Sequence, residues 1–240
     1  MIEHPKPSAV FVAGATGLTG RAVVARLCKR QIPVVAHVRP DSARLDEWKE
    51  HFSSLGAEVD TTAWDEVAMS EAMKKHKPEW VFALLGTTRA RSKASAKQGV
   101  EESYMTVDYG MTVLLARALT HAGLRPGFVY LSSIGVHADS QNSYIRARYL
   151  VEQFLEESPL PYIIARPSFI LGNRDQDRPM ERVGAFFGDN LLRLAGFLGA
   201  KRLQHRYQSL TNEELAEALI RLAEDPDTRR QTFERHQFPL

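Results

Sequence analysis

Three glycines near the N-terminus have the spacing with which a backbone turn cradles a phosphate. They belong to the segment Gly14-Ala-Thr-Gly17-Leu-Thr-Gly20, which follows the apolar run AVFVA and opens an apolar-periodic helix. Gly14 allows a tight turn, Gly17 lets a diphosphate approach the backbone, and Gly20 permits close packing of the helix. The helix N-terminus adds N–H donors and a positive dipole end. We therefore predict a dinucleotide-binding loop composed of Gly14, Thr16, Gly17, Leu18, Thr19 and Gly20.

The end of the second apolar run bears on the choice between NADP and NAD. An NAD site has a carboxylate there to bind the adenosine ribose, but the chain reads His37-Val38-Arg39-Pro40. A guanidinium can bind a 2′-phosphate through a bidentate, charge-assisted contact, so Arg39 favours NADP. A solvated strand-end arginine is the alternative, and Asp41 could serve the ribose if the register slips. After the third run, Asp65 is a candidate for binding the adenine amino group, although a helix-capping aspartate would look identical.

A serine, a tyrosine and an arginine could carry out proton transfer at the other end of this site. Ser133 follows the run GFVYLS, and a predicted helix carries Tyr144 and, four residues later, Arg148. That spacing places the tyrosine and the arginine on one helical face, above the sheet edge where a nicotinamide would lie. Tyr144 would protonate the alkoxide that develops from a carbonyl, Ser133 would hold the carbonyl oxygen, and Arg148 would favour the ionised phenol.

The elements that must position these residues alternate along the whole chain. The apolar runs AVFVA, PVVAHV, AEV, WVFALLG, GFVYLS and PYIIA each precede a longer amphipathic segment. Runs this apolar suit strands covered on both faces, and their alternation with helices predicts βαβ units with right-handed crossovers. We therefore predict an α/β fold with a doubly wound, Rossmann-like parallel sheet whose ligands bind at the carboxyl ends of the strands.

Helices are predicted after these runs over residues 18–30, 42–54, 66–75, 100–122 and 144–157. Thr211 and Glu214 form a capping box that opens another helix, and the segment QTFERH predicts a last edge strand. The alternation loosens over approximately residues 172–208. We interpret these residues as a small C-terminal substrate-side region within a single domain that spans residues 1–240.

Composition and charge exclude several other classes of protein. The 240 residues are 44% hydrophobic and 25% charged, which is typical of soluble globular proteins. Subtracting 29 acidic from 31 basic residues leaves a net charge of +2, so no large positive field would gather nucleic acid. The single cysteine, Cys28, excludes thiolate cages, and the eight histidines show no helical pair of ligands, so we predict no metal.

The same observations predict a compartment and partners. A lone cysteine fits a reducing environment, and the chain shows neither a membrane-length apolar stretch nor a signal-peptide pattern. We therefore expect a cytoplasmic protein without membrane contact, present as a monomer or a homodimer. Its partners would be a small-molecule substrate of unknown identity and, under a regulatory role, another protein.

The motifs described above resemble the atypical and extended branches of the short-chain dehydrogenase/reductase superfamily over most of the chain. The likeness is carried first by GATGLTG, Ser133 and Tyr144. The most similar subgroup is that of the Tat-interacting (metastasis-suppressor) proteins, through Leu85-Gly86-Thr87-Thr88-Arg89, Val107-Asp108, LSS, Arg166-Pro167, Arg174 and Arg178-Pro179. The resemblance implies that Tyr144 is the proton donor. It further implies cofactor contacts at Leu85, Gly86, Thr87 and Tyr144 and, near the nicotinamide end, at Ile170 and Arg178.

One residue departs from the family pattern. Where the family has Tyr-x-x-x-Lys, this chain has Arg148 four residues after Tyr144. Arginine keeps the positive charge and could hydrogen-bond the nicotinamide ribose, but its pKa above ~12 prevents it from relaying a proton. Cofactor binding should tolerate this change better than turnover does. Two functions therefore remain: an NADP(H)-dependent oxidoreductase acting on a carbonyl or alcohol, or a catalytically weak or inactive regulatory protein that senses NADPH.

Overall fold

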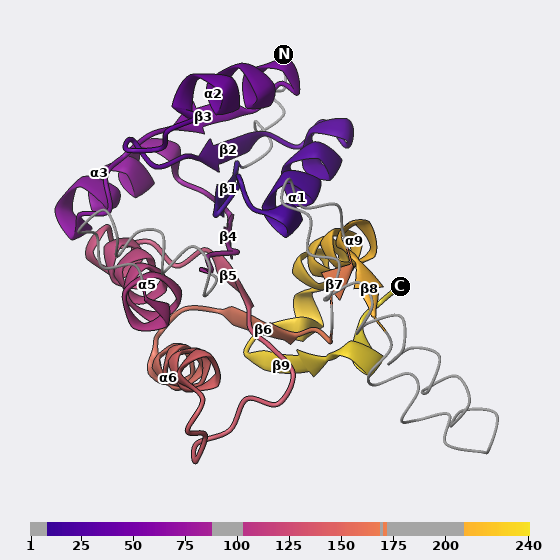
Figure 1. Ribbon diagram of the computed structural model, residues 1–240. Coiled ribbons are helices and arrows are strands. Elements are labelled where there is room, and N and C mark those ends of the chain that lie inside the picture. The colour runs from indigo at the N-terminus through magenta and orange to yellow at the C-terminus, as the bar shows by residue number, and fades with distance from the viewer. Residues whose placement is uncertain (1–8, 88–102, 169, 172–208) are drawn as a thin grey trace.

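The six apolar runs form six strands of a parallel sheet, and the segment QTFE adds a seventh strand at its edge (Figure 1). The computed structural model describes residues 9–87, 103–168, 170–171 and 209–240. The strands are β1 (Val10–Ala13), β2 (Val34–His37), β3 (Glu58–Asp60), β4 (Trp80–Ala83), β5 (Gly127–Leu131), β6 (Tyr162–Arg166) and β9 (Gln231–Glu234). Their order is β3-β2-β1-β4-β5-β6-β9, with every neighbouring pair parallel. The predicted α/β, Rossmann-like fold is confirmed.

This strand order fixes where a ligand can bind. The chain runs from β1 outward to β3, then returns to the other side of β1 to form β4. The loops that follow β1 and β4 therefore diverge to opposite sides of the sheet and leave a crevice at its carboxyl edge. The glycine-rich loop follows β1, so the fold places it at this crevice.

Alternate residues of the strands face two separate hydrophobic cores, which is why the runs are apolar throughout. Val10 and Val12 of β1 belong to one core, whereas Phe11 and Ala13 belong to the other. One face is covered by α1 (Leu18–Lys29), α2 (Leu45–Ser54) and α9 (Asn212–Glu224), and the other by α3 (Glu66–His76), α5 (Thr112–His121) and α6 (Ser143–Glu157) (Figure 1). Because both faces are covered, ligand chemistry is confined to the edge.

The predicted helix over residues 100–122 shows the largest difference from expectation. Residues 100–102 lie outside the described ranges, and the helix then begins as the π-helix η1 (Tyr104–Met111) before it continues as α5. Ser103 caps its start by accepting a hydrogen bond from the Thr106 amide at 3.1 Å. A π-helix has a wider turn than an α-helix and is frequent at functional sites. Apolar periodicity in the sequence did not reveal this change of helical pitch.

The C-terminal elements complete the first face of the sheet. The predicted capping box opens α9: Thr211 Oγ1 accepts from the Glu214 amide at 3.1 Å, and the Glu214 carboxylate accepts from the Thr211 amide at 2.8 Å. Arg30, the C-cap residue of α1, pairs with Glu217 of α9 at 2.7 Å.

A small parallel sheet that the sequence did not predict joins β7 (Ile170–Leu171) to β8 (Leu210–Thr211). Short 3₁₀ turns, η2 (Pro226–Thr228) and η3 (Arg235–Gln237), flank β9, and the predicted substrate-side region 172–208 lies outside the described residues.

Candidate functional site

The three glycines of the loop have different structural roles. Gly14 has a φ of +81°, and a Cβ on it would lie 2.5 Å from the Leu84 carbonyl oxygen. A Cβ on Gly20 would overlap the Gly14 carbonyl oxygen, so the first turn of α1 packs directly on the loop. Gly17 is exposed, and a Cβ there would meet the same oxygen at a less severe 3.2 Å. The fold itself requires Gly14 and Gly20, whereas Gly17 leaves backbone open to a ligand.

The N-terminus of α1 lacks the side-chain cap that α3, α6 and α9 have, and so does that of α2. Gly17 is the N-cap residue, no side chain caps it, and the first turn contains no acidic residue. By contrast, Asp65 caps α3, Asn142 caps α6 and Thr211 caps α9. An N-terminus without a side-chain cap presents N–H donors and a positive dipole end, the combination that binds phosphate groups. The loop is therefore suited to a diphosphate.

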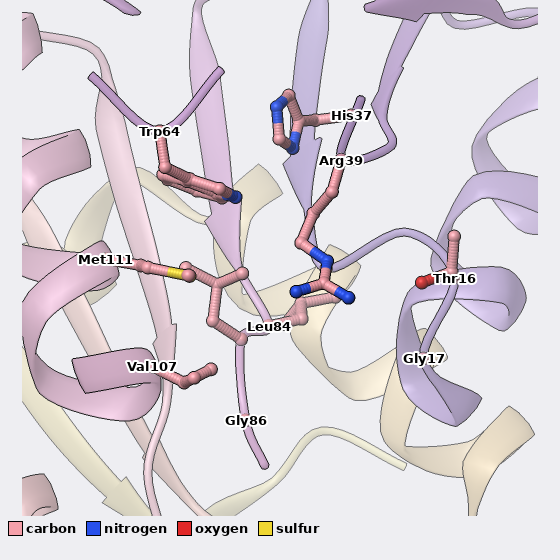
Figure 2. Close-up of a pocket in the computed structure, with 11 residues that line it drawn as sticks. Thr16, Gly17, His37, Arg39, Trp64, Leu84, Gly86, Val107 and Met111 are labelled. Carbon is pink, nitrogen blue, oxygen red and sulfur yellow. The ribbon is translucent and has the colours of Figure 1, made fainter. Parts of the chain in front are cut away.

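The loop forms one wall of a pocket at the carboxyl edge of the sheet (Figure 2). The lining residues come from the loop, from the end of β2, from the segment before α3, from the segment after β4 and from η1: Gly14, Thr16, Gly17, His37, Arg39, Trp64, Leu84, Leu85, Gly86, Val107 and Met111. The structure thus brings together the loop residues, Arg39, Leu85 and Gly86, as the sequence predicts. The predicted residues Leu18, Thr19 and Gly20 form the first turn of α1.

Arg39 extends into this pocket from the end of β2 (Figure 2). Its side chain is 31% exposed, and its Nε lies 3.7 Å from Asp41 Oδ1. Asp41, with 71% of its side chain exposed, is not among the described residues that line the pocket. The geometry therefore favours Arg39 over Asp41 as the residue that would contact an adenosine ribose or its phosphate.

Asp65 caps helix α3, which is the alternative to adenine binding that the sequence left open. Its carboxylate accepts hydrogen bonds from the amides of Val67 at 3.1 Å and Ala68 at 2.9 Å, and so caps α3. Both hydrogen bonds go to Oδ1, so the predicted contact between Asp65 and the adenine amino group stays a prediction. The residue immediately before it, Trp64, lines the pocket instead.

A polar network fixes the segment that carries Trp64. Asp60 accepts hydrogen bonds from the Thr62 amide at 2.9 Å and lies 3.0 Å from His76 Nε2. Burial opposes ionisation of Asp60, but these hydrogen bonds lower its pKa to about 2. His37 donates from Nε2 to the Thr62 carbonyl oxygen at 2.8 Å, and its ring meets the Trp64 indole edge-on at 4.8 Å. Burial lowers the pKa of His37, so its imidazole is neutral at physiological pH.

At the other end of the site, Arg148 is buried in an ion pair. Only 5% of the residue is exposed, and its Nη2 lies 2.9 Å from Asp108 Oδ1. It also donates to the Leu131 carbonyl oxygen and lies 4.8 Å from the centre of the Tyr144 ring. A Cβ on Gly86 would lie 3.3 Å from its Nη2, so the cation lies directly behind the pocket lining. Any contact with the nicotinamide ribose would come from a guanidinium that protein groups already hold.

The surroundings of this ion pair keep Arg148 charged and tie it to the loop after β4. Burial lowers the pKa of Arg148, but Tyr130, Tyr144 and Asp108 together raise it above its ordinary value. Asp108 also accepts a hydrogen bond from the Thr87 amide at 2.9 Å. The pair therefore braces Gly86 and Thr87, two residues for which the resemblance implies cofactor contacts. Thr87 is itself buried, and its Oγ1 has no hydrogen-bond partner among the described residues.

The two serines after β5 have different surroundings. Ser132 is buried and donates to the Glu152 carboxylate, which also accepts from Arg166 Nε at 3.0 Å. Ser133 is half-buried, and its hydroxyl donates to the Ile134 carbonyl oxygen at 3.3 Å, a long and weak contact. Ser133 is therefore the better placed of the two to exchange its partner for a substrate oxygen.

Two further predicted contacts lie away from this pocket or outside the described residues. Ile170 lies in β7 and packs against the first hydrophobic core. Arg178 falls in the range 172–208, which the structure does not describe. Five lining residues were missed by the sequence reasoning, namely His37, Trp64, Leu84, Val107 and Met111. His37 and Leu84 lie within two residues of predicted ones, but the positions of the other three depend on where α3 begins and on the π-helix.

A family model described as NAD(P)H-binding matches residues 14–190, starting at the first glycine of the loop. The chain therefore belongs to this NAD(P)H-binding family. The FMP52 protein of Debaryomyces hansenii, named as mitochondrial, is 26% identical over 219 residues, which cover 91% of this chain and 88% of the relative.

Solved structures share the fold of this chain at low sequence identity. A putative NAD-dependent epimerase/dehydratase from Bacillus halodurans superposes with a TM-score of 0.66 at 17% identity, covering 94% of this chain and 92% of that one. A short-chain dehydrogenase/reductase from Veillonella parvula, in complex with NADP, gives a TM-score of 0.59 at 13% identity with the same coverage. The fold is thus that of the short-chain dehydrogenases/reductases and related epimerases.

These comparisons correct two expectations. Relatives that match most of the chain include FMP52 proteins of several fungi, and these do not support the finer resemblance to Tat-interacting proteins. The expected cytoplasmic location is wrong by the same comparison, because these relatives are named as mitochondrial proteins. Within the described ranges, each helix is too short or too polar to cross a lipid bilayer.

Proposed function

We propose that the protein is an NADP(H)-dependent oxidoreductase that interconverts a carbonyl and an alcohol. One observation carries this proposal: the uncapped glycine loop and the Arg39 side chain line the same pocket. The main-chain N–H groups of the loop would hold the diphosphate, and the guanidinium would bind the 2′-phosphate. The bound NADP in the structural relative from Veillonella parvula supports this choice of cofactor.

The residues near Arg148 would handle the proton of the reaction. A bound nicotinamide supplies the hydride for reduction, or accepts it in the reverse direction. Tyr144 would give its phenolic proton to the substrate oxygen, while Ser133 donates a hydrogen bond to the same oxygen. Arg148, which lies against the Tyr144 ring, favours the phenolate that remains but cannot relay a proton from solvent. Turnover would therefore depend on water to restore the phenol.

The buried ion pair favours a second candidate function. The family lysine is replaced by Arg148, which Asp108 and the Leu131 carbonyl oxygen hold in place. A protein that binds NADPH and signals its redox state to a protein partner would keep the nucleotide site without needing efficient proton relay. A panel of ketones, aldehydes and nucleotide-sugars separates the two candidates, because both bind nucleotide but only the oxidoreductase consumes NADPH.

Replacing Arg39 with alanine should weaken NADPH binding by about ten- to a hundredfold and change NADH binding by less than about threefold. A charge-assisted contact with a phosphate contributes roughly 1.5–3 kcal/mol, and NADH lacks that phosphate. Calorimetric titration with both nucleotides measures the two affinities. Arg44→Ala is the matched control, because Arg44 lies at the start of α2 and pairs with Glu47 at 2.7 Å. An equal loss of affinity for NADPH and for NADH would show that Arg39 does not contact the 2′-phosphate.

Replacing Tyr144 with phenylalanine should lower the turnover number by at least about a hundredfold and leave NADPH affinity within about twofold. A positioned general acid contributes roughly 10²–10⁴-fold to rate. The measurement is the loss of NADPH absorbance with the best substrate of the panel. Tyr104→Phe is the control, since the Tyr104 ring contacts Tyr144 edge-on at 5.3 Å and should be dispensable for proton transfer. An unchanged rate in Tyr144→Phe would remove this residue from the mechanism.

A further inference from the structure

The indole N–H of Trp64 is a buried donor that the described protein residues do not satisfy. Its Nε1 is buried and has no hydrogen-bond partner among the residues that the structure describes. Figure 2 shows this nitrogen turned into the pocket, on the side of the Arg39 guanidinium. Buried donors are almost always paired, because an unpaired donor has lost its hydrogen bond to water and gained none within the protein. An unpaired donor that faces a pocket points to a ligand acceptor.

The surrounding contacts hold the indole in this orientation. The segment before Trp64 is fixed by the hydrogen bonds between Asp60 and Thr62. The His37 ring, itself held by the Thr62 carbonyl oxygen, packs edge-on against the indole. Trp64 also packs against the second hydrophobic core, so rotation of the ring would break apolar contacts. The donor is therefore preorganised.

The composition of the pocket walls indicates what kind of acceptor would lie opposite this donor. Leu84, Val107 and Met111 supply apolar surface, and Arg39 supplies a planar cation. A flat heteroaromatic ring suits both, since a guanidinium stacks on aromatic faces and apolar side chains cover the rest. The 2′-phosphate would stay at the Arg39 guanidinium, because a doubly charged group would be poorly solvated against the apolar side chains. The acceptor should thus belong to a base.

We propose that Trp64 Nε1 donates a hydrogen bond to a ring nitrogen of the adenine of NADP(H). In this arrangement the base is read by the tryptophan and not by the neighbouring Asp65, which caps α3. The inference rests on the proposed nucleotide function and adds a residue that selects the base. Because adenine is common to NADPH and NADH, the contact should serve both nucleotides, unlike the contact made by Arg39.

The test is Trp64→Phe, which keeps an aromatic ring and removes the N–H donor. We expect affinity to fall by about three- to tenfold for NADPH and by the same factor for NADH, the effect of one neutral hydrogen bond. Thermal stability without nucleotide should fall only modestly, because phenylalanine keeps part of the packing of Trp64 against the second hydrophobic core. Trp48→Phe is the matched control: Trp48 lies on α2, stacked on Phe52, and its loss should leave both affinities unchanged.

Each other outcome overturns the inference. Unchanged affinity in Trp64→Phe, or a loss confined to NADPH, would exclude a base contact, the latter assigning the donor to the 2′-phosphate. An affinity loss in a variant that no longer unfolds cooperatively without nucleotide would assign Trp64 a packing role. Failure of the wild-type protein to bind either nucleotide would instead reject the proposed function, so the two failures are distinguishable.

Discussion

Replacing Gly17 with aspartate is expected to abolish measurable NADPH binding while the fold stays as stable or becomes more stable. Aspartate is a favoured N-cap residue, and Gly17 already has the extended backbone of an N-cap, with φ −72° and ψ 167°. The same carboxylate would lie where we place the diphosphate. Two like charges about 4 Å apart repel by roughly 4 kcal/mol at an effective dielectric constant of 20, which corresponds to roughly a thousandfold loss in affinity.

The control for this change is Gly17→Asn, which has the same size and the same capping capacity without the charge. Asparagine should raise helix stability similarly and weaken NADPH by a smaller factor, through bulk alone. Thermal denaturation gives the stability of each variant, and calorimetric titration gives its affinity. Retention of wild-type NADPH affinity in Gly17→Asp would mean that no phosphate binds at the N-terminus of α1.

Replacing Arg148 with methionine is expected to lower the free energy of unfolding by about 3–5 kcal/mol. The change removes the cation that faces Asp108, a residue with no exposed surface, and so leaves its carboxyl group buried without a counter-charge. The double variant Arg148→Met/Asp108→Leu should recover part of that loss, because it removes the unpaired charge but leaves the Thr87 amide without its acceptor. Urea denaturation of the single and double variants measures the coupling between the two residues.

The comparison variant is Arg146→Met on the same helix. Arg146 is exposed and donates to the Ala138 carbonyl oxygen at 2.5 Å, so its replacement should change stability by less than about 0.5 kcal/mol. If Arg148→Met were no more destabilising than Arg146→Met, the brace behind Gly86 and Thr87 would have no energetic basis. In that case Arg148 would be available for the cofactor contact that the sequence predicts.

The fold and the glycine loop could be predicted because their signals are local. Strands buried on both faces need continuous apolar runs, and the turn after β1 needs glycine where φ is positive or where backbones meet. Arg39 could be identified for a similar reason, since the end of a strand places its side chain at the edge where ligands bind. Neighbouring residues alone were sufficient for each of these predictions.

The remaining features depend on contacts that are distant in sequence or on patterns with two meanings. An aspartate before a helix looks the same whether it caps the helix or binds a base, so Asp65 was ambiguous and Trp64 was missed. The burial of Arg148 depends on Asp108, forty residues earlier. The π-helical turn that places Val107 and Met111 in the pocket lining leaves no mark in apolar periodicity.

Calorimetric titration of the unmodified protein with NADPH and with NADH tests the central claim most directly. The geometry of the loop and of Arg39 predicts saturable binding of one nucleotide per chain, with NADPH at least about tenfold tighter than NADH. Absence of heat from both nucleotides at millimolar concentration would contradict the account. Tighter binding of NADH than of NADPH would contradict the role assigned to Arg39.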